Sequence, residues 1–183
     1  MRRKSFETLE CPIARSLERV GEWWSILVLR DAFLGATRFE QFQKSLEIAP
    51  NMLARRLNAL VEAGMLEKRR YSERPPRDEY LLTERGRDFR PVLWALLAWG
   101  NRQFAPGGPS VQIVDAETGV PADPVLMDAI SLRPLEPPFF RTVPGPGASE
   151  GFRKRHGAFA GNSAPTSAKA ARSAQRRLGD ANV

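Results

Sequence analysis

The first third of the chain places apolar residues with the period of α-helices. They recur at steps of three and four, and residues 23–34 are apolar at nearly every position. A helix that is apolar on most faces is usually buried at the centre of a domain. Gly21, Gly35 and Gly64 end successive stretches. The pattern predicts four helices within residues 11–64, of which the last two are short and joined by a brief turn.

Two of these helices have recognisable start signals. Thr37, followed three residues later by Glu40, fits a capping box in which each side chain satisfies a free backbone donor. Pro50 suits the first turn of the fourth helix, where its missing N–H costs nothing. Beyond Pro50 the leucines gather on one side of the helix, and arginines and asparagines lie roughly opposite. The fourth helix is therefore expected to have one buried side and one polar side.

After the fourth helix the period changes from helix to strand. Residues 65–71 and 79–82 have strand-like composition, and a polar segment with two prolines separates them. This predicts a two-stranded hairpin over residues 66–82 with a charged tip. Thr83 can then cap a long helix that extends to about residue 104. A short helix, a turn, a second helix and a charged hairpin together predict a winged helix-turn-helix, in a mainly α, α+β fold.

Composition narrows the classes of protein and of site. The 183 residues are 42% hydrophobic and 27% charged, with one cysteine, which excludes full disorder, a fibre and a disulfide scaffold. No apolar run approaches the roughly 18 residues that cross a bilayer, and no signal peptide follows the first residues. We therefore expect a cytoplasmic protein without membrane contact. No metal-ligand spacing and no glycine-rich phosphate loop occurs, so no catalytic residue, metal or cofactor is expected.

The formal charge of +7 is unevenly distributed. Residues 1–105 carry a net +5, the acidic residues 106–150 a net −4, and the remainder is basic again. Proline–glycine clusters mark both changes, and the last part has too few large apolar residues to offset its ordering entropy. The sequence therefore predicts a winged-helix domain over 9–105, a small β-hairpin appendage over 110–147 and a disordered basic tail over 148–183.

The appendage contains an internal repeat with an offset of 13 residues, in which Val114–Pro124 matches Met127–Pro137. Each copy is expected to form a strand, a turn started by aspartate and a short return strand. Two such units are too small to hold a core alone. We expect them to rest on the helical domain or on another subunit.

Six short motifs occur in order over about residues 9–104. They are Cys11–Pro12, Gly21–Leu29, Arg38–Phe39, Asn51–Leu57, Leu60–Gly64 and Tyr80–Gly86. In this order and spacing they resemble the HxlR-type winged-helix transcription regulators, which are MarR-like. The resemblance implies a sequence-specific regulator that binds double-stranded DNA as a homodimer. Two positions depart from the pattern, since Trp23 stands where a basic residue is common and Ala49 where a capping serine is frequent.

The resemblance and the residue chemistry together predict a DNA interface. The recognition helix over 50–63 would enter the major groove, where arginine and asparagine pair with guanine and adenine. The wing over 66–82 would follow the backbone and the minor groove. For Arg56 a bracing role against the hairpin or an acidic neighbour stays open. The predicted interface residues are Thr37, Arg38, Asn51, Met52, Arg55, Arg56, Asn58, Arg69, Arg70, Arg74 and Arg77.

Cys11 matches a position at which some members of this family sense oxidants or thiol-reactive compounds. The start of a helix and the nearby Arg15 would favour a reactive thiolate. The alternative is a small apolar residue packed at the dimer contact. Two other functions stay open: a winged-helix module that binds proteins, and a regulator that responds to a small-molecule effector or to redox state through Cys11 or a pocket at the dimer interface.

Overall fold

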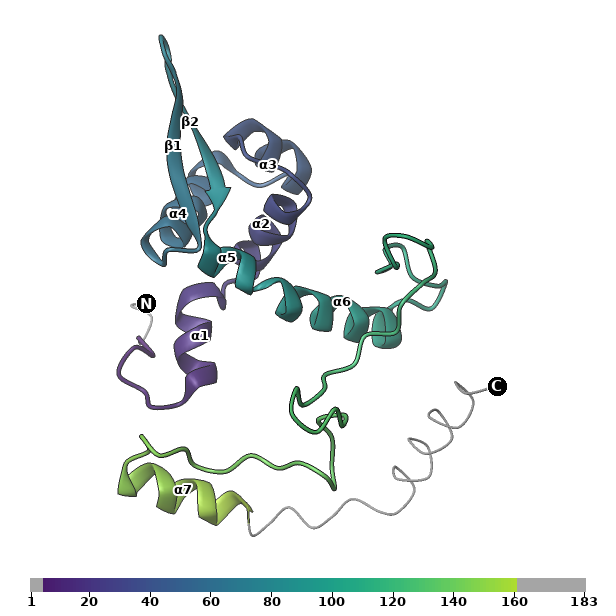
Figure 1. The fold of residues 1–183 in the computed structure, drawn as a ribbon. Helices are drawn as coiled ribbons and strands as arrows, with labels where there is room; N and C mark the ends of the chain where they lie inside the picture. Colours follow the sequence, from purple (N-terminus) through teal and green to yellow (C-terminus); the bar gives the residue numbers. More distant parts are fainter. Residues whose placement is uncertain (1–4, 161–183) are drawn as a thin grey trace. The chain divides into compact units, whose positions relative to one another are not determined.

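The computed structural model describes residues 5–160, and these belong to two compact units that divide after Pro124. Helices α1 to α6 and the hairpin β1–β2 lie in the first unit, and α7 lies in the second (Figure 1). The division falls inside the segment expected to be one appendage. The elements are α1 (Pro12–Val20), α2 (Trp23–Phe33), α3 (Phe39–Leu46), α4 (Pro50–Glu62), β1 (Leu66–Glu73), β2 (Pro76–Leu82), α5 (Glu84–Asp88), α6 (Arg90–Phe104) and α7 (Glu150–Ala160).

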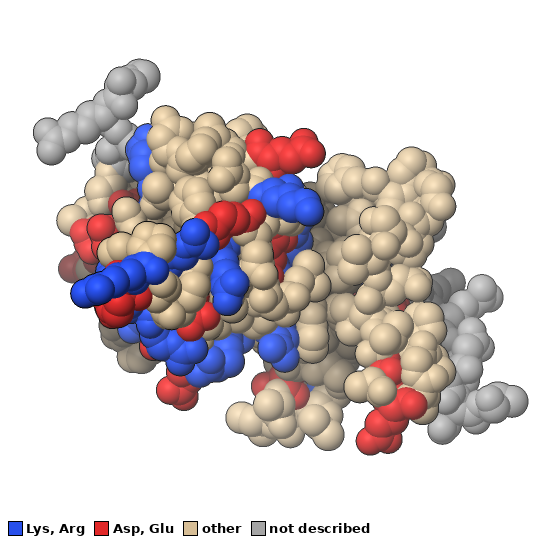
Figure 2. Space-filling view, turned by 90° about the horizontal axis from the view of Figure 1, so that it is seen from above, with Lys and Arg blue, Asp and Glu red and all other residues tan. Residues whose placement is uncertain are grey.

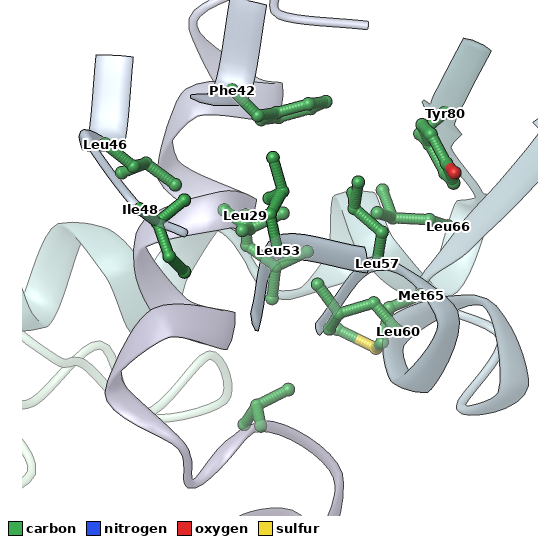
Figure 3. Packing of buried hydrophobic residues seen from close by; sticks show 12 residues of the cluster. Leu29, Phe42, Leu46, Ile48, Leu53, Leu57, Leu60, Met65, Leu66 and Tyr80 are labelled. Carbon is green, nitrogen blue, oxygen red and sulfur yellow. The ribbon is translucent and has the colours of Figure 1, made fainter. Parts of the chain in front are cut away.

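The core of the first unit lies between α2, α3, α4 and the base of the hairpin (Figure 3). Leu53, Leu57 and Leu60 of α4 are fully buried, and they meet Leu29 of α2 and Phe42 of α3. Each such side chain contributes about 1.5–3 kcal/mol on leaving water. This burial confirms the four predicted helices and fixes which side of α4 faces outward.

The start of α3 differs in detail from the prediction. The helix begins at Phe39, so its third residue is Gln41 rather than Glu40. The Oε1 atom of Gln41 accepts hydrogen bonds from the backbone N–H groups of Arg38 at 2.8 Å and of Thr37 at 2.9 Å. The predicted capping box of Thr37 with Glu40 is therefore wrong, because the helix begins one residue later than that spacing assumed.

The predicted hairpin is present, with a shorter tip. Strands β1 and β2 pair antiparallel from Leu66 with Leu82 out to Glu73 with Pro76, with one bulge on the way. The polar segment that the sequence assigns to a loop is therefore mostly paired strand. Figure 1 shows this hairpin projecting from the helical unit beside α3 and α4. Such a projection is the wing of a winged helix-turn-helix.

Two helices replace the single long helix expected after Thr83. The hydroxyl of Thr83 accepts from the N–H of Gly86 at 3.0 Å, which confirms its capping role. The helix then breaks at Phe89, since Pro91 in the first turn of α6 disfavours a continuous helix through the residues before it.

The first repeat folds back along α6 within the same unit. The side-chain amide of Asn101 donates to the carbonyl of Val111 at 2.9 Å, and Arg102 lies 3.9 Å from Asp123. A cavity of about 230 Å³ lies between this helix and the returning segment. The first repeat therefore uses one side of α6 as its support.

Both repeats form the turns that the sequence predicts, but the expected strands shrink to single bridges. In the first turn the Asp115 carboxylate accepts from the backbone and hydroxyl of Thr118 at 2.8 and 2.9 Å. In the second, Asp128 accepts from the backbone and hydroxyl of Ser131 at 2.8 and 2.6 Å. One antiparallel bridge closes each turn. These hydrogen bonds lower the pKa of both aspartates, because they stabilise the charged form.

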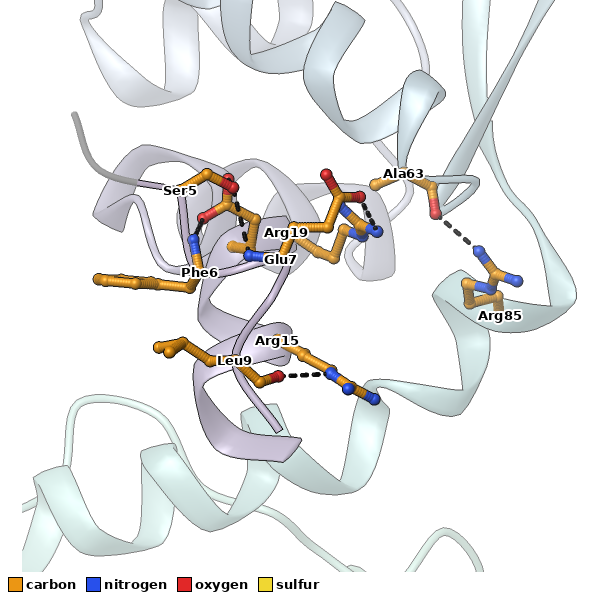
Figure 4. A network of polar contacts seen from close by, with 9 residues as sticks. Ser5, Phe6, Glu7, Leu9, Arg15, Arg19, Ala63 and Arg85 are labelled. Atoms are coloured by element: carbon orange, nitrogen blue, oxygen red, sulfur yellow. Dashed lines mark hydrogen bonds and ion pairs between the residues drawn. The ribbon is translucent and has the colours of Figure 1, made fainter. Parts of the chain in front are cut away.

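The segment before α1 is tied to that helix by polar contacts (Figure 4). The Glu18 carboxylate accepts from the Ser5 hydroxyl at 3.1 Å and from the backbone N–H of Phe6 at 3.0 Å. An ion pair of 3.1 Å joins Arg19 to Glu7. The first described residues therefore fold back along α1.

The beginning of the expected disordered tail is helical. Within residues 148–183, α7 covers Glu150–Ala160. The Ser149 hydroxyl accepts from the N–H of Phe152 at 3.1 Å, and Lys154 pairs with Glu150 at 2.7 Å. A side-chain cap and a pair one turn apart favour this short helix despite its polar composition. The prediction of disorder is wrong for these residues, and residues 161–183 lie outside the described part.

Candidate nucleic-acid interface

Helix α4 carries the polar side that the sequence predicts. Pro50 occupies its first turn, and Ala49 before it supplies no side-chain cap. The leucines face the core, whereas Asn51, Arg55 and Asn58 are exposed. Their side is free because the leucine stripe fixes the rotation of the helix.

Two of these exposed residues have uncommitted side chains. Within residues 5–160, neither Arg55 nor Asn58 makes a side-chain hydrogen bond or an ion pair. Asn51 accepts from the backbone N–H of Met52 at 2.8 Å and so also serves the start of the helix. Met52 is half-buried and packs against the core. The donors available to an external partner are therefore concentrated at Arg55 and Asn58.

Arg56 takes the bracing role that the sequence leaves open. Its side chain is only 13% exposed, and its Nη2 atom lies 3.6 Å from the carboxylate of Glu22. Glu22 precedes the first residue of α2, so this contact joins the start of α2 to the middle of α4. Among the described residues no acceptor reaches the buried Nε atom of Arg56. This arginine is a structural contact between two helices rather than an exposed donor.

Basic residues on the two wing strands are paired with acids. Arg69 contacts Glu79 at 2.8 Å, and Arg70 contacts Asp78 at 2.6 Å. Lys68 lies 3.0 Å from Asp78 as well. Hydrogen bonds from Arg70, and then from Lys68, hold the pKa of Asp78 below its ordinary value. The acids partly neutralise the wing, so a phosphate would have to compete with them for Arg69 and Arg70.

The tip of the wing has basic residues without such partners. Arg74 and Arg77 are exposed, and in the part of the chain that the structure describes neither has an ion pair or a side-chain hydrogen bond. They are the wing cations that an external anion can reach without breaking an existing pair.

Thr37 and Arg38 connect the start of α3 to the wing. The N–H of Tyr80 donates to the carbonyl of Thr37 at 2.7 Å, and Arg38 forms an antiparallel bridge with Glu79. The guanidinium of Arg38 lies 4.6 Å from the centre of the Tyr71 ring. Such a stack is worth about 0.5–1 kcal/mol at an exposed site. Both residues therefore orient the wing, a role that helical periodicity does not reveal.

Sequence reasoning missed two further basic residues near this face. Lys44 of α3 is exposed and, within the described residues, has no ion pair. Arg85 donates to the carbonyl of Ala63 at 3.0 Å, which satisfies the C-terminal end of α4 (Figure 4). Lys44 lies on the helix before the recognition helix, and that position was the only signal for it.

Positive charge is common on the face that the wing points toward. Figure 2 shows Lys and Arg side chains gathered over the helical unit on this face, with Asp and Glu side chains between them. The mixture reflects the wing pairs described above. The surface is therefore suited to a polyanion, with its acids limiting how strongly it attracts one.

Cys11 lies at the start of α1 as a free, half-buried thiol. Arg15, expected to favour a thiolate, donates its Nε–H to the carbonyl of Leu9 at 2.6 Å (Figure 4). A redox role for Cys11 stays a prediction. Among the described residues no cluster of His, Cys, Asp or Glu is arranged to hold a metal ion, and none of their helices is long and apolar enough to span a bilayer.

Comparison with known proteins agrees with this architecture. The HxlR-like helix-turn-helix family matches residues 19–107. An uncharacterised HTH-type transcriptional regulator of Mycobacterium tuberculosis, Rv3095, is 39% identical over 141 residues, which cover 74% of this chain and 86% of that protein. The chain belongs to the HxlR-like helix-turn-helix family. It is a transcriptional regulator with a helix-turn-helix DNA-binding fold, as its relatives are.

Two solved structures of HxlR-like length and fold resemble the chain beyond the matched domain. PA1374 of Pseudomonas aeruginosa, described as a candidate transcription factor, is 56% identical with a TM-score of 0.59, covering 79% of this chain and 99% of that one. PA1607, described in the same way, is 39% identical with a TM-score of 0.68, covering 76% and 98%. Both matches are longer than the HxlR-like domain, so the segment after α6 has counterparts.

Proposed function

We propose that this HxlR-like regulator binds specific sites in double-stranded DNA as a homodimer. The observation that carries the proposal is the exposed pair Arg55 and Asn58, which lies opposite the buried leucines of α4 and has no partner among the described residues. Arginine and asparagine pair with guanine and adenine through two hydrogen bonds each. Helix α4 would lie in the major groove, and the wing would place Arg74 and Arg77 on the backbone or in the minor groove.

Exposed apolar side chains on two helices support the dimer. On α6, Val92, Leu96 and Trp99 follow at steps of four and three and are 52%, 44% and 49% exposed. On α1, Ile13 and Leu17 are 71% and 44% exposed, one turn apart. Such stripes on short helices mark contact surfaces. A twofold pair would present its two recognition helices to successive major grooves, about 34–36 Å apart.

A mobility-shift titration on the promoter region of the protein's own gene, or of a divergent neighbour, tests the proposal. If six to ten phosphates are neutralised, affinity falls by about 10³–10⁵ between 50 and 200 mM salt. The double variant Arg55→Ala with Asn58→Ala should lose discrimination between the operator and random DNA. Lys154→Ala, on exposed α7, serves as a charge-matched control that leaves discrimination unchanged.

Equal binding of the wild type to operator and random DNA, or no complex at low salt, would overturn the proposal. The rival role as a protein-binding module is separated by the same variants. If protein binding is the function, Arg55→Ala with Asn58→Ala should spare a partner complex recovered from cells. A DNA-binding function predicts that these residues matter for DNA alone.

A further inference from the structure

The second repeat carries a large apolar tip where the first repeat is polar. With the offset of 13 residues, Glu117 and Gly119 correspond to Ile130 and Leu132. Ile130 is 95% exposed and Leu132 is 70% exposed. The aspartate-centred hydrogen bonds are the same in both turns. The two turns therefore share one framework and differ in what they present to the outside.

The backbone of the second turn is strained in order to present this tip. Gly119 has a φ of 72°, a left-handed conformation that glycine adopts freely, and Leu132 at the matching position has a φ of 52°. A side chain in this region costs about 1–3 kcal/mol. Leu132 gains no burial within its own unit in return. A strained and exposed leucine indicates a contact made with something outside that unit.

The surroundings of the tip are also uncovered. None of residues 125–158 is buried. Val125 and Leu126 are each 63% exposed, and Phe139 is 53% exposed. Contiguous exposed apolar side chains on this scale mark a binding surface. We call Val125, Leu126, Ile130, Leu132 and Phe139 the second-repeat surface.

We infer that the second-repeat surface docks on a second copy of this chain, against the exposed apolar side chains of its α1 and α6. The inference rests on the homodimer of the proposed function and adds a segment to its interface. The five exposed residues of α1 and α6 named above offer on the order of 500 Å², which is short of the roughly 800 Å² that each partner contributes to a stable interface. The second-repeat surface supplies the missing area.

Charge complementarity favours the same occupant. Residues 106–150 carry a net −4, and residues 1–105 carry a net +5. A second copy therefore offers both the apolar surface and the opposite charge. In a twofold dimer the contact occurs twice, since each copy contributes one tip and one helical face.

Site-specific photo-crosslinking tests the inference in the full chain without DNA. A benzophenone amino acid replaces Ile130, and the matched control carries it in place of Glu117, at the equivalent position of the polar turn. We expect irradiation to give a covalent dimer, of twice the 20.5 kDa chain mass, from position 130 and not from position 117. Crosslinks within one chain only, no covalent dimer, or equal yields from both positions would each overturn the inference.

A second measurement uses a substitution that relieves strain. Leu132→Gly places the residue of the first turn in the second, so the turn itself should persist. We expect the dimer dissociation constant, measured by sedimentation, to rise about tenfold, whereas Glu117→Ala leaves it unchanged. An unchanged constant for Leu132→Gly overturns the inference alone. A wild type that stays monomeric at all concentrations overturns the proposed dimer with it, and DNA binding is scored separately.

Discussion

At the scale of single residues, two adjacent arginines of α4 have separable roles. Arg56 is nearly buried against Glu22, whereas Arg55 is exposed. We predict that Arg56→Ala lowers the free energy of unfolding by about 1–3 kcal/mol, because it removes a buried stem and an ion pair. Arg55→Ala should change that free energy by less than about 0.5 kcal/mol. Urea unfolding of both variants measures this.

The same two variants have the opposite ranking in DNA binding. Arg55→Ala should weaken operator binding by about 1–3 kcal/mol if it is paired with a guanine. A folded Arg56→Ala protein should retain the preference for the operator. If Arg56→Ala is as stable as the wild type and loses that preference, then Arg56 reads bases and the bracing role is wrong.

A second residue-scale prediction concerns Gly86, which is buried in α5 against the base of the hairpin. A Cβ atom added there would collide with the backbone carbonyl of Met65. Backbone cannot move aside as a flexible side chain does, so we predict that Gly86→Ala destabilises the protein by about 1–3 kcal/mol. Gly107→Ala is the control, since nothing lies within 4 Å of its added Cβ. Thermal unfolding compares the two, and equal melting temperatures would contradict the prediction.

These residues show how far side-chain roles follow from sequence. The buried and exposed sides of α4 could be predicted, because a period of 3.6 residues fixes which positions share a side. The role of Arg56 could not, since its partner Glu22 lies on another helix, more than thirty positions away along the chain. The cap of α3 depended on a shift of one residue in the start of the helix, which periodicity does not resolve.

At the scale of elements, the wing contains a coupled ion pair that pH can probe. Hydrogen bonds from Arg70 and Lys68 lower the pKa of Asp78 below its ordinary value of 3.8. A carboxylate with a lowered pKa stabilises the folded hairpin above the ordinary value, and this contribution is lost as pH falls through the folded-state pKa. We predict that the side-chain carboxyl carbon of Asp78 titrates below pH 3.8 by nuclear magnetic resonance.

In Arg70→Ala the Asp78 midpoint should move upward, toward 3.8. Asp115 provides an internal reference, because its pKa is lowered by hydrogen bonds from Thr118 and Glu117, which Arg70→Ala does not touch. A wild-type Asp78 midpoint at or above 3.8, or equal shifts at both aspartates, would show that the wing pair does not form in solution.

The elements themselves were predictable where local signals decide them. The helices before the wing, the hairpin and the two aspartate turns all have such signals in their own residues. The break at Phe89 was missed because the apolar stripe continues through Pro91, and α7 was missed because its composition is polar. The bridge between Arg38 and Glu79 joins segments about forty residues apart, so no local pattern announces it.

At the scale of the whole molecule, the apolar stripe of α6 should decide whether the protein acts as one unit or two. Leu96 is 44% exposed and Trp99 is 49% exposed, so the single chain gains little from burying them. We predict that Leu96→Asp leaves the fold of each chain intact but moves the sedimentation of the protein to the monomer at micromolar concentration, because a charge would be desolvated in the dimer.

Loss of the dimer should weaken operator binding far more than any single contact does. Two linked recognition helices bind with an effective concentration that separate helices lack, and this is worth about 10²–10⁴ in affinity. The matched control is Gln103→Ala on the same helix, which removes an exposed polar side chain and should leave both properties unchanged. If Leu96→Asp remains dimeric, the α6 stripe is not the contact. If it becomes monomeric and binds the operator as tightly as before, then each chain reads DNA alone.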